Sequence, residues 1–341
     1  MRFEDVWIAG TGGTYGELVP IEQAVADGAY ERIAADSTGM VTVSQSAEAP
    51  PEMAVTAGRQ ALKEAAELGI EVGPDAQVLH GCASFQGIDM WSAASWIGGE
   101  LLGTQLGCLP TTVQAWSNGS LASLAVAANT LTAQPGVPAA LLTVADRFAP
   151  PTDRYYASPG MVFGDGGAAA VVTRGGGRLR LLSCVSETDT VLGGLSKGEE
   201  KFRSAPSGEP PDARRRTREF LARGEVSLRD VQQRSAERTR SVVARALAEA
   251  GLSTEEVDWF VPPFVGRMLY REAFVRPSGV TPRNTLLDLG LSIGHLGAGD
   301  GLFALNHLIS ADLLEPGATV LLIGTGMGFT FSAAVLAASR G

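Results

Sequence analysis

The sequence predicts an α/β protein built on a layered, mainly parallel β-sheet. Two observations carry this prediction: short apolar runs alternate with segments of helical periodicity, and the chain is rich in glycine (42) and poor in charged residues (19%). Short continuous apolar runs are typical of strands buried on both faces, and glycine suits tight corners between elements. With 341 residues and 45% hydrophobic content, the chain is long enough for one large or two medium domains.

Nine segments have the length and apolar character of strands, and helical patterns lie between them. The strand candidates are Val6–Ala9, Ala76–Gly81, Thr111–Ala115, Ala139–Ala145, Ala168–Thr173, Leu179–Val185, Asp258–Val261, Thr319–Ile323 and Phe329–Ala334. The helix candidates are Pro51–Leu68, Asn118–Thr132, Leu228–Ala250 and Gly301–Leu314. In the first of these helices, Met53, Ala57, Ala61 and Ala65 recur at the spacing of one helical face.

A weak internal echo divides the chain into two halves. Residues 164–174 (GDGGAAAVVTR) and 326–336 (GMGFTFSAAVL) each join a glycine turn to an apolar strand near a basic residue. This indicates duplication, with an N-terminal half at 1–175 and a C-terminal half at 176–341. Between Gly193 and Gly224 the composition shifts to Ser, Gly, Pro and charged residues, which we interpret as a surface excursion rather than a domain.

Composition excludes several classes of function. The net charge of −10 argues against a nucleic-acid binder. The three cysteines, Cys82, Cys108 and Cys184, are widely spaced without a metal-ligand pattern, so we expect reduced thiols and no metal site. A charged N-terminus that leads straight into a strand is unlike a signal peptide, and no apolar run has the length of a membrane span. We therefore expect a cytoplasmic protein.

One corner of the sequence is a candidate nucleophile site. The predicted strand Thr111–Ala115 turns into a helix of small residues through Trp116, Ser117 and Asn118. A side chain at such a corner faces the positive end of a helix. That end can activate a cysteine, but a serine hydroxyl also needs a positioned base.

A base and a carboxylate lie in one glycine-rich stretch, GHLGAGD. His295 is one of three histidines in the chain, and Asp300 follows it by five residues. Ser117, His295 and Asp300 therefore form the candidate catalytic set. Each has an alternative: Ser117 as a remnant of a lost site, His295 as a core or helix-capping histidine, and Asp300 as a helix N-cap. Cys108 is a rival nucleophile, which we interpret as a packing residue.

Four blocks of the sequence resemble the β-ketoacyl-acyl carrier protein synthase III branch of the thiolase superfamily. In chain order they are Trp116–Gly119 at the nucleophile corner, Phe163–Ala168 at an "FGDGAGA" turn, Trp259–Pro263 at a "W-x-x-P-H" segment, and Gly324–Phe329 at the glycine-rich closing loop. They span nearly the whole chain. The resemblance implies a thiolase fold: two similar β-α halves with back-to-back mixed sheets around buried helices, in five layers. It also implies a homodimer.

The chain departs from this family at all three positions of the Cys-His-Asn set that condensing members use. Ser117 replaces the cysteine, Pro263 the histidine, and His295 the asparagine. Without an ionisable group at Pro263, the oxyanion site for decarboxylative condensation is at best half built. We therefore expect transfer of an intact acyl group instead of carbon–carbon bond formation.

The resemblance further implies roles for the remaining groups. His295 would accept the Ser117 proton and later deprotonate a hydroxyl, amine or thiol acceptor, while Asp300 fixes its tautomer. The backbone N–H groups of Ser117 and Met327 occupy the oxyanion-hole positions. The set is similar to that of an atypical branch in antibiotic and polyketide pathways. The donor would be a thioester of coenzyme A or of an acyl carrier protein, bound as substrate, with no resident cofactor.

Further residues are candidates for substrate contact. Trp116 and Phe85 either wall the acyl pocket or pack in the core, and His80 is interpreted as a packing residue, with a place in the acyl pocket as the alternative. Arg214, Arg215 and Arg216 are by default a solvated basic run, and the alternative is contact with phosphates of coenzyme A or of a phosphopantetheinyl carrier. The segment 146–148 is a candidate for tuning substrate access.

Two other functions remain open at this point. One is a condensing enzyme that selects the starter unit of polyketide synthesis. The other is a catalytically silent partner subunit that keeps the thiolase dimer. A covalent adduct on Ser117 and carbon dioxide release from a malonyl extender distinguish the three hypotheses.

Overall fold

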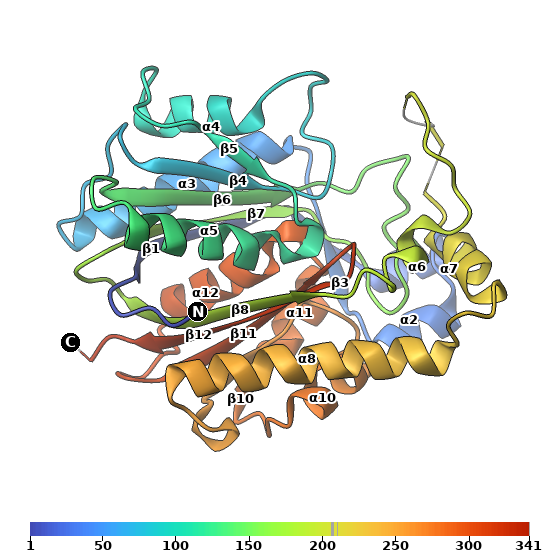
Figure 1. Ribbon diagram of the computed structural model, residues 1–341. Coiled ribbons are helices and arrows are strands. Elements are labelled where there is room, and N and C mark those ends of the chain that lie inside the picture. Colours follow the sequence, from blue (N-terminus) through green and yellow to red (C-terminus); the bar gives the residue numbers. More distant parts are fainter. Residues whose placement is uncertain (206–207, 210, 341) are drawn as a thin grey trace.

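A computed structural model describes residues 1–205, 208–209 and 211–340. In this part of the chain, ten strands form one mixed sheet and two form a small antiparallel sheet (Figure 1). The strands are β1 Trp7–Tyr15, β2 Glu17–Pro20, β3 Thr42–Gln45, β4 Gln77–Gly81, β5 Thr111–Val113, β6 Ala139–Asp146, β7 Gly166–Thr173, β8 Leu179–Thr188, β9 Trp259–Val261, β10 Asn284–Thr285, β11 Thr319–Gly326 and β12 Thr330–Ala338. The helices are α1 Ile21–Ala26, α2 Arg32–Thr38, α3 Pro50–Glu67, α4 Ala93–Leu102, α5 Gly119–Ala133, α6 Gly194–Lys197, α7 Ala213–Ala222, α8 Leu228–Ala250, α9 Arg267–Leu269, α10 Arg276–Ser278, α11 Leu287–Ile293 and α12 Asp300–Ser310.

The ten-stranded sheet consists of two runs with the same topology. One run has the order β1-β7-β6-β4-β5 and the other β8-β12-β11-β9-β10. In each run the first three strands pair antiparallel, and the last two lie parallel to the third. The runs pair with each other through β1 and β8, where Trp7 and Ile8 face Arg180 and Leu179.

This topology confirms an α/β fold with mixed sheets and corrects the expectation of a mainly parallel sheet. The apolar runs report burial on both faces, and here antiparallel strands such as β6 and β7 are also fully buried. The apolar pattern therefore does not indicate whether neighbouring strands are parallel or antiparallel.

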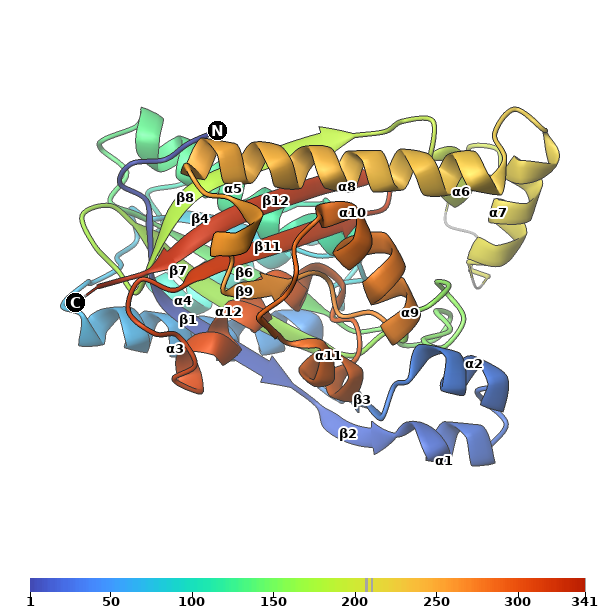
Figure 2. The same ribbon diagram turned by 90° about the horizontal axis from the view of Figure 1, so that it is seen from below.

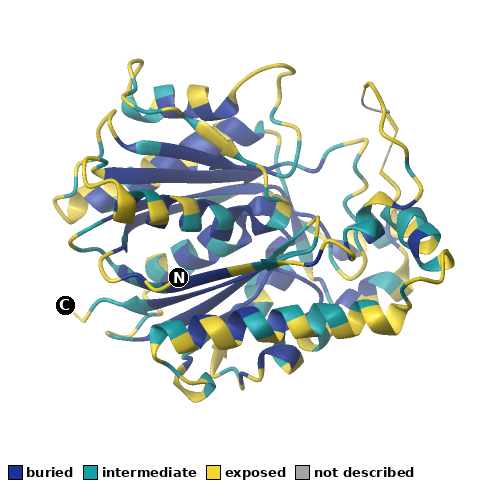
Figure 3. Cartoon of the chain, viewed as in Figure 1, coloured by how far each residue is buried: buried dark blue, intermediate teal, exposed yellow. Residues whose placement is uncertain are grey.

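Helices and sheet form five layers (Figures 1 and 2). Helices α5 and α12 lie between the two runs and contact strands of both. Helix α3 covers the outer face of the first run and α8 that of the second. The strands and the inner helices make up most of the buried residues in Figure 3. The two inner helices start close to each other, and this brings the candidate site residues together.

Strand β1 is longer than predicted because glycine lets α3 lie directly on it. A Cβ added at Gly12 would lie 2.0 Å from the Ala57 carbonyl oxygen, and one at Gly10 would lie 2.1 Å from that of Ala61. Only glycine fits such an approach. Three glycines, Gly10, Gly12 and Gly13, interrupt the apolar run after Ala9, so the prediction stopped there.

The inner helix α5 should be sensitive to loss of packing. Leu124 is fully buried in the core between the two runs. We expect Leu124→Ala to lower the free energy of unfolding by about 2–5 kcal/mol, because the neighbouring elements cannot collapse into the cavity. Urea denaturation measures this, with Val126→Ala as the exposed control on the same helix. Equal losses in both variants would contradict the buried position of α5.

Candidate active site

The nucleophile corner is a short 3₁₀ turn between β5 and α5. The turn spans Trp116–Asn118, and α5 begins at Gly119. Trp116 has a φ of 52°, a left-handed conformation that is uncommon for a residue with a side chain. A Cβ added at Gly119 would lie 2.6 Å from the Cβ of Ala298, so the start of α5 rests against the chain that leads into α12. The corner thus presents Ser117 toward the His295–Asp300 segment.

Ser117, His295 and Asp300 form one chain of hydrogen bonds. The Ser117 Oγ lies 2.7 Å from His295 Nε2, and His295 Nδ1 lies 2.5 Å from Asp300 Oδ2. His295 is 1% exposed and Asp300 4% exposed. A carboxylate only accepts hydrogen bonds, so Nδ1 carries the proton and the Nε2 lone pair faces the serine hydroxyl. This is the arrangement needed to remove a proton from Ser117.

The Asp300 carboxylate is oriented by backbone donors. Its Oδ1 accepts the Leu296 N–H at 2.7 Å, and its Oδ2 accepts the Phe264 N–H at 2.8 Å. Asp300 is the first residue of α12, whose N-cap is Gly299, and its side chain makes no capping hydrogen bond. The alternative of Asp300 as an N-cap is therefore wrong.

The backbone of His295 is fixed by the "FGDGG" block. Its N–H donates to the Val162 carbonyl at 2.8 Å, and its carbonyl accepts the Gly164 N–H at 2.9 Å. The Phe163 ring lies against the imidazole, with ring centroids 5.4 Å apart. The block thus holds both the backbone and the ring plane of His295.

The glycine-rich closing loop packs on the nucleophile corner. It is the turn between β11, which ends at Gly326, and β12, which begins at Thr330. A Cβ added at Gly326 would lie 2.4 Å from the Ala115 carbonyl oxygen, so the loop touches the residues just before Ser117. Met327 lies in this turn and is partly exposed.

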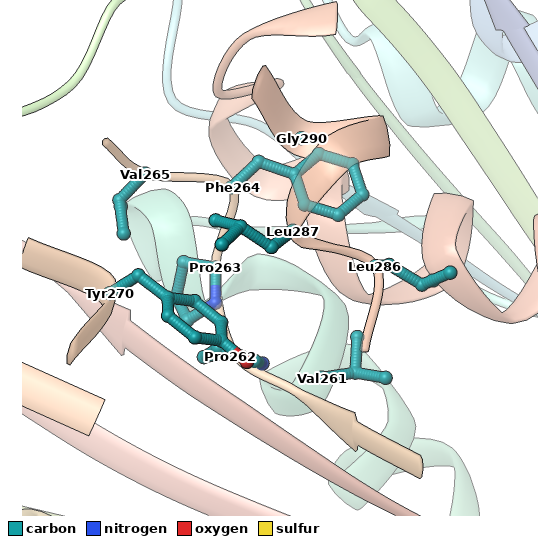
Figure 4. Close-up of a pocket in the computed structure, with 9 residues that line it drawn as sticks. All are labelled: Val261, Pro262, Pro263, Phe264, Val265, Tyr270, Leu286, Leu287 and Gly290. Carbon is teal, nitrogen blue, oxygen red and sulfur yellow. The ribbon is translucent and has the colours of Figure 1, made fainter. Parts of the chain in front are cut away.

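Pro263 lies in a segment that reaches the site through its backbone. Its neighbour Phe264 donates its N–H to Asp300, as described above. A cavity of about 10 Å³, with room for roughly one water molecule, lies beside this segment (Figure 4). Its lining is apolar and consists of Val261, Pro262, Pro263, Phe264, Val265, Tyr270, Leu286, Leu287 and Gly290. The chain therefore supplies a main-chain donor to Asp300 beside the position where the family has an imidazole.

The candidate acyl-pocket residues differ in exposure. His80 is fully buried, and its ring nitrogens contact Thr143 Oγ1 at 2.9 Å and Gln86 Oε1 at 3.0 Å. Burial lowers the pKa of His80 to about 4, so the ring is neutral. The buried ring agrees with the interpretation of His80 as a packing residue, and a place in the acyl pocket stays a prediction. Phe85 is 61% exposed and Trp116 is also exposed, so neither is a core residue.

The basic run Arg214–Arg216 lies at the start of α7 and is engaged within the chain. Arg215 pairs with Glu219 at 2.5 Å and with Glu200 at 2.6 Å, and Arg216 pairs with Glu200 at 2.9 Å. The Arg214 guanidinium lies 4.5 Å from the centroid of the Tyr156 ring.

Glu200 and Glu219 thus compensate the charges of Arg215 and Arg216, and contact of the run with a phosphate stays a prediction. The surface excursion 193–224 contains α6 and α7. Residues 206, 207 and 210 of the excursion lie outside the described residues.

Asp146 is a buried carboxylate next to the site, and its structural role was not predicted from the sequence. Asp146, at the end of β6, is fully buried and accepts N–H groups of Ala83, Ser84 and Ala298 at 2.6–2.8 Å. Burial raises its pKa. Asp146 thus ties the loop after β4 to the turn before Asp300, and a role of segment 146–148 in substrate access stays a prediction. The lone aspartate at the end of the apolar run AALLTVAD was the available signal.

Within residues 1–205, 208–209 and 211–340, no group of three or more His, Cys, Asp or Glu side chains is placed to hold a metal ion. In the same part of the chain, no helix combines the length and apolarity needed to cross a bilayer.

Comparison with known proteins assigns the family. The model of 3-oxoacyl-[acyl-carrier-protein] synthase III matches residues 112–190, and the model of its C-terminal part matches residues 247–338. Together they cover half of the chain. The protein therefore belongs to the 3-oxoacyl-[acyl-carrier-protein] synthase III family of the thiolase superfamily.

A curated relative supports this assignment at low identity. The β-ketoacyl-[acyl-carrier-protein] synthase III of Chelativorans sp. (strain BNC1) is 25% identical over 177 residues, or 52% of this chain and 51% of the relative. The chain thus spans about half the length of the curated relative that it matches.

Solved structures match over the full length. ChlB3, an acyltransferase, superposes with a TM-score of 0.88 at 29% identity, covering 98% of both chains. A variant of OleA from Xanthomonas campestris has a TM-score of 0.77 at 19% identity, covering 99% of both chains. FabH from Pseudomonas aeruginosa PAO1 has a TM-score of 0.75 at 18% identity, covering 98% of this chain and 99% of FabH. The last two show the fold alone.

Proposed function

We propose that the protein is an acyltransferase that takes an intact acyl group from a thioester onto Ser117 and passes it to a nucleophilic acceptor. The observation that carries the proposal is the chain of hydrogen bonds from Ser117 through His295 to Asp300. A serine with a positioned imidazole and carboxylate is the set that acyl transfer requires.

In the first step, His295 Nε2 accepts the hydroxyl proton while Ser117 Oγ attacks the thioester carbonyl. The tetrahedral oxyanion accepts hydrogen bonds from the N–H groups of Ser117 and Met327. The carbon–sulfur bond then breaks, and the thiol leaves with the proton held by His295. Asp300 stabilises the imidazolium between these events.

In the second step, the acceptor takes the place of the thiol. His295 removes a proton from its hydroxyl, amine or thiol group as that group attacks the Ser117 ester. Collapse of the second tetrahedral intermediate releases the product and returns the proton to Ser117. No carbon–carbon bond forms, in keeping with the proline at position 263.

The donor class and the assembly are part of the proposal. Membership in the family and the likeness to ChlB3 support a thioester of coenzyme A or of an acyl carrier protein as donor, in polyketide or antibiotic synthesis. Exposed apolar side chains near the edge strand β5 support a homodimer that covers them. They belong to Phe85, Ile88, Met90 and Leu109. We also propose a cytoplasmic location.

Detection of a covalent acyl-enzyme on Ser117 tests the proposed function. We expect mass spectrometry, after incubation with a panel of acyl thioesters, to find the acyl mass on the peptide that contains Ser117. Ser117→Ala should lose the adduct, while Cys108→Ala, which removes the rival nucleophile, should keep it. Failure of the wild-type protein to acylate with any donor would support the silent subunit. Carbon dioxide release from a malonyl-carrier protein would support the condensing enzyme.

A further inference from the structure

The residue after the nucleophile, Asn118, joins the nucleophile corner to the β11–β12 hairpin. Its side chain is 3% exposed. The Nδ2 group donates to Thr330 Oγ1 at 3.1 Å and to Ser332 Oγ at 2.8 Å. Both acceptors lie on β12, just beyond the turn that carries Met327. One amide thus connects Ser117 to both ends of a short stretch of that strand.

The hairpin forms a socket shaped for this amide. Gly324 pairs with Ser332 and Gly326 pairs with Thr330 across the two strands. A Cβ added at Gly324 would lie 2.3 Å from Asn118 Oδ1, and one at Gly326 would lie 3.1 Å from the Cβ of Asn118. The glycines of β11 therefore leave space for the Asn118 side chain, and the paired residues on β12 provide the hydroxyl groups that accept its hydrogen bonds.

Two further features indicate that the socket has a purpose beyond packing. The Asn118 Oδ1 atom is buried and has no hydrogen-bond partner among the described residues, an arrangement that costs free energy. An apolar residue would avoid this cost. Ser332 Oγ is itself fixed at 2.8 Å from Ser186 Oγ on the neighbouring strand β8, so the socket is anchored in the sheet.

We propose that Asn118 is a positioning residue that holds the Met327–Phe329 turn at a fixed place relative to Ser117. Through this turn it sets where the Met327 N–H meets the oxyanion. The inference rests on the proposed acyl transfer and adds a specific route by which the chain orients its oxyanion hole. Donors in such a hole act only at the right distance from the developing charge, so a small shift of the turn lowers the rate.

The test is the rate of Ser117 acylation in Asn118→Ala. We expect the maximal acylation rate to fall by about 10- to 100-fold, with the donor concentration for half-saturation changed by less than about threefold. Ser123→Ala is the control, because Ser123 is a buried serine on the same inner helix that lies next to Gly81 of β4. Its hydroxyl has no hydrogen-bond partner in the described part of the chain. It should acylate like the wild type.

A double-mutant cycle separates positioning from a general loss of stability. Thr330→Val removes one acceptor of the amide and should slow acylation in the wild-type background, but have little further effect when combined with Asn118→Ala. Additive losses, or a wild-type rate in Asn118→Ala, would overturn the inference while leaving the acyl-enzyme intact. Absence of acylation in the wild type would instead overturn the proposed function.

Discussion

Replacing His295 by alanine should lower the rate of acyl transfer by roughly four to six powers of ten. The serine hydroxyl would then face no base, since the Nε2 that lies 2.7 Å from Ser117 Oγ is removed. Ser117→Ala should cost about as much, because the two residues act as one unit. The double variant should be no slower than either single variant. Single-turnover assays with an acyl thioester measure all three rates.

A matched control is available in His307, which lies on α12 and is only partly buried. His307→Ala should leave the rate within about threefold of the wild type, because surface changes away from a site are nearly neutral. If His295→Ala acylated at the wild-type rate, the imidazole would be a structural residue, and the buried-histidine alternative would hold.

The second large effect is expected for Asp300→Asn, with a fall in rate of roughly 10⁴-fold. The amide presents N–H to His295 Nδ1, which forces the ring proton onto Nε2, and Nε2 can then no longer accept from Ser117. The same amide also faces the N–H groups of Leu296 and Phe264, which now donate to the carboxylate. We therefore expect a lower melting temperature as well, measured by calorimetry alongside the rate.

The two readouts of Asp300→Asn separate the roles of the carboxylate. A purely structural aspartate would lower the melting temperature but leave the rate per folded molecule nearly unchanged. A rate within tenfold of the wild type, measured below the unfolding transition, would exclude Asp300 from the proton-transfer chain.

The candidate set could be predicted from the sequence because its signals are local. Ser117 lies at a corner between an apolar run and a helix of small residues, and His295 and Asp300 are only five residues apart among glycines. Four sequence blocks in the order of a family then predicted the thiolase fold. What the sequence did not contain was the distance between the blocks, which depends on how the two inner helices meet.

The missed features depend on contacts between distant residues. In the sequence, the glycines of β1 are typical of a loop. The structure shows that α3 packs directly on them, which explains why glycine occurs in this strand. Arg215 and Arg216 look like a free basic run, but their partners Glu200 and Glu219 come from the chain around them. His80 lies near the end of a strand both in the prediction and in the structure. Only the structure, however, shows that Thr143 and Gln86 contact its two ring nitrogens. The small sheet of β2 and β3, with α1 and α2 between its strands, had no clear periodic signal and was not predicted.

Because the two runs of the sheet have the same topology, the pairing of β1 with β8 affects how the two halves of the site are placed relative to each other. Helix α5, which follows Ser117, and helix α12, which starts at Asp300, occupy equivalent places in the two runs of the sheet. The reacting groups are therefore divided between two copies of one architecture, whose strands meet at Trp7–Ile8 and Leu179–Arg180. A slip of one residue at this seam would displace the runs by about 3.3 Å, more than a hydrogen bond can stretch. The register of the β1–β8 pairing therefore helps to set the distance between the Ser117 hydroxyl and the His295 imidazole, on which proton transfer depends.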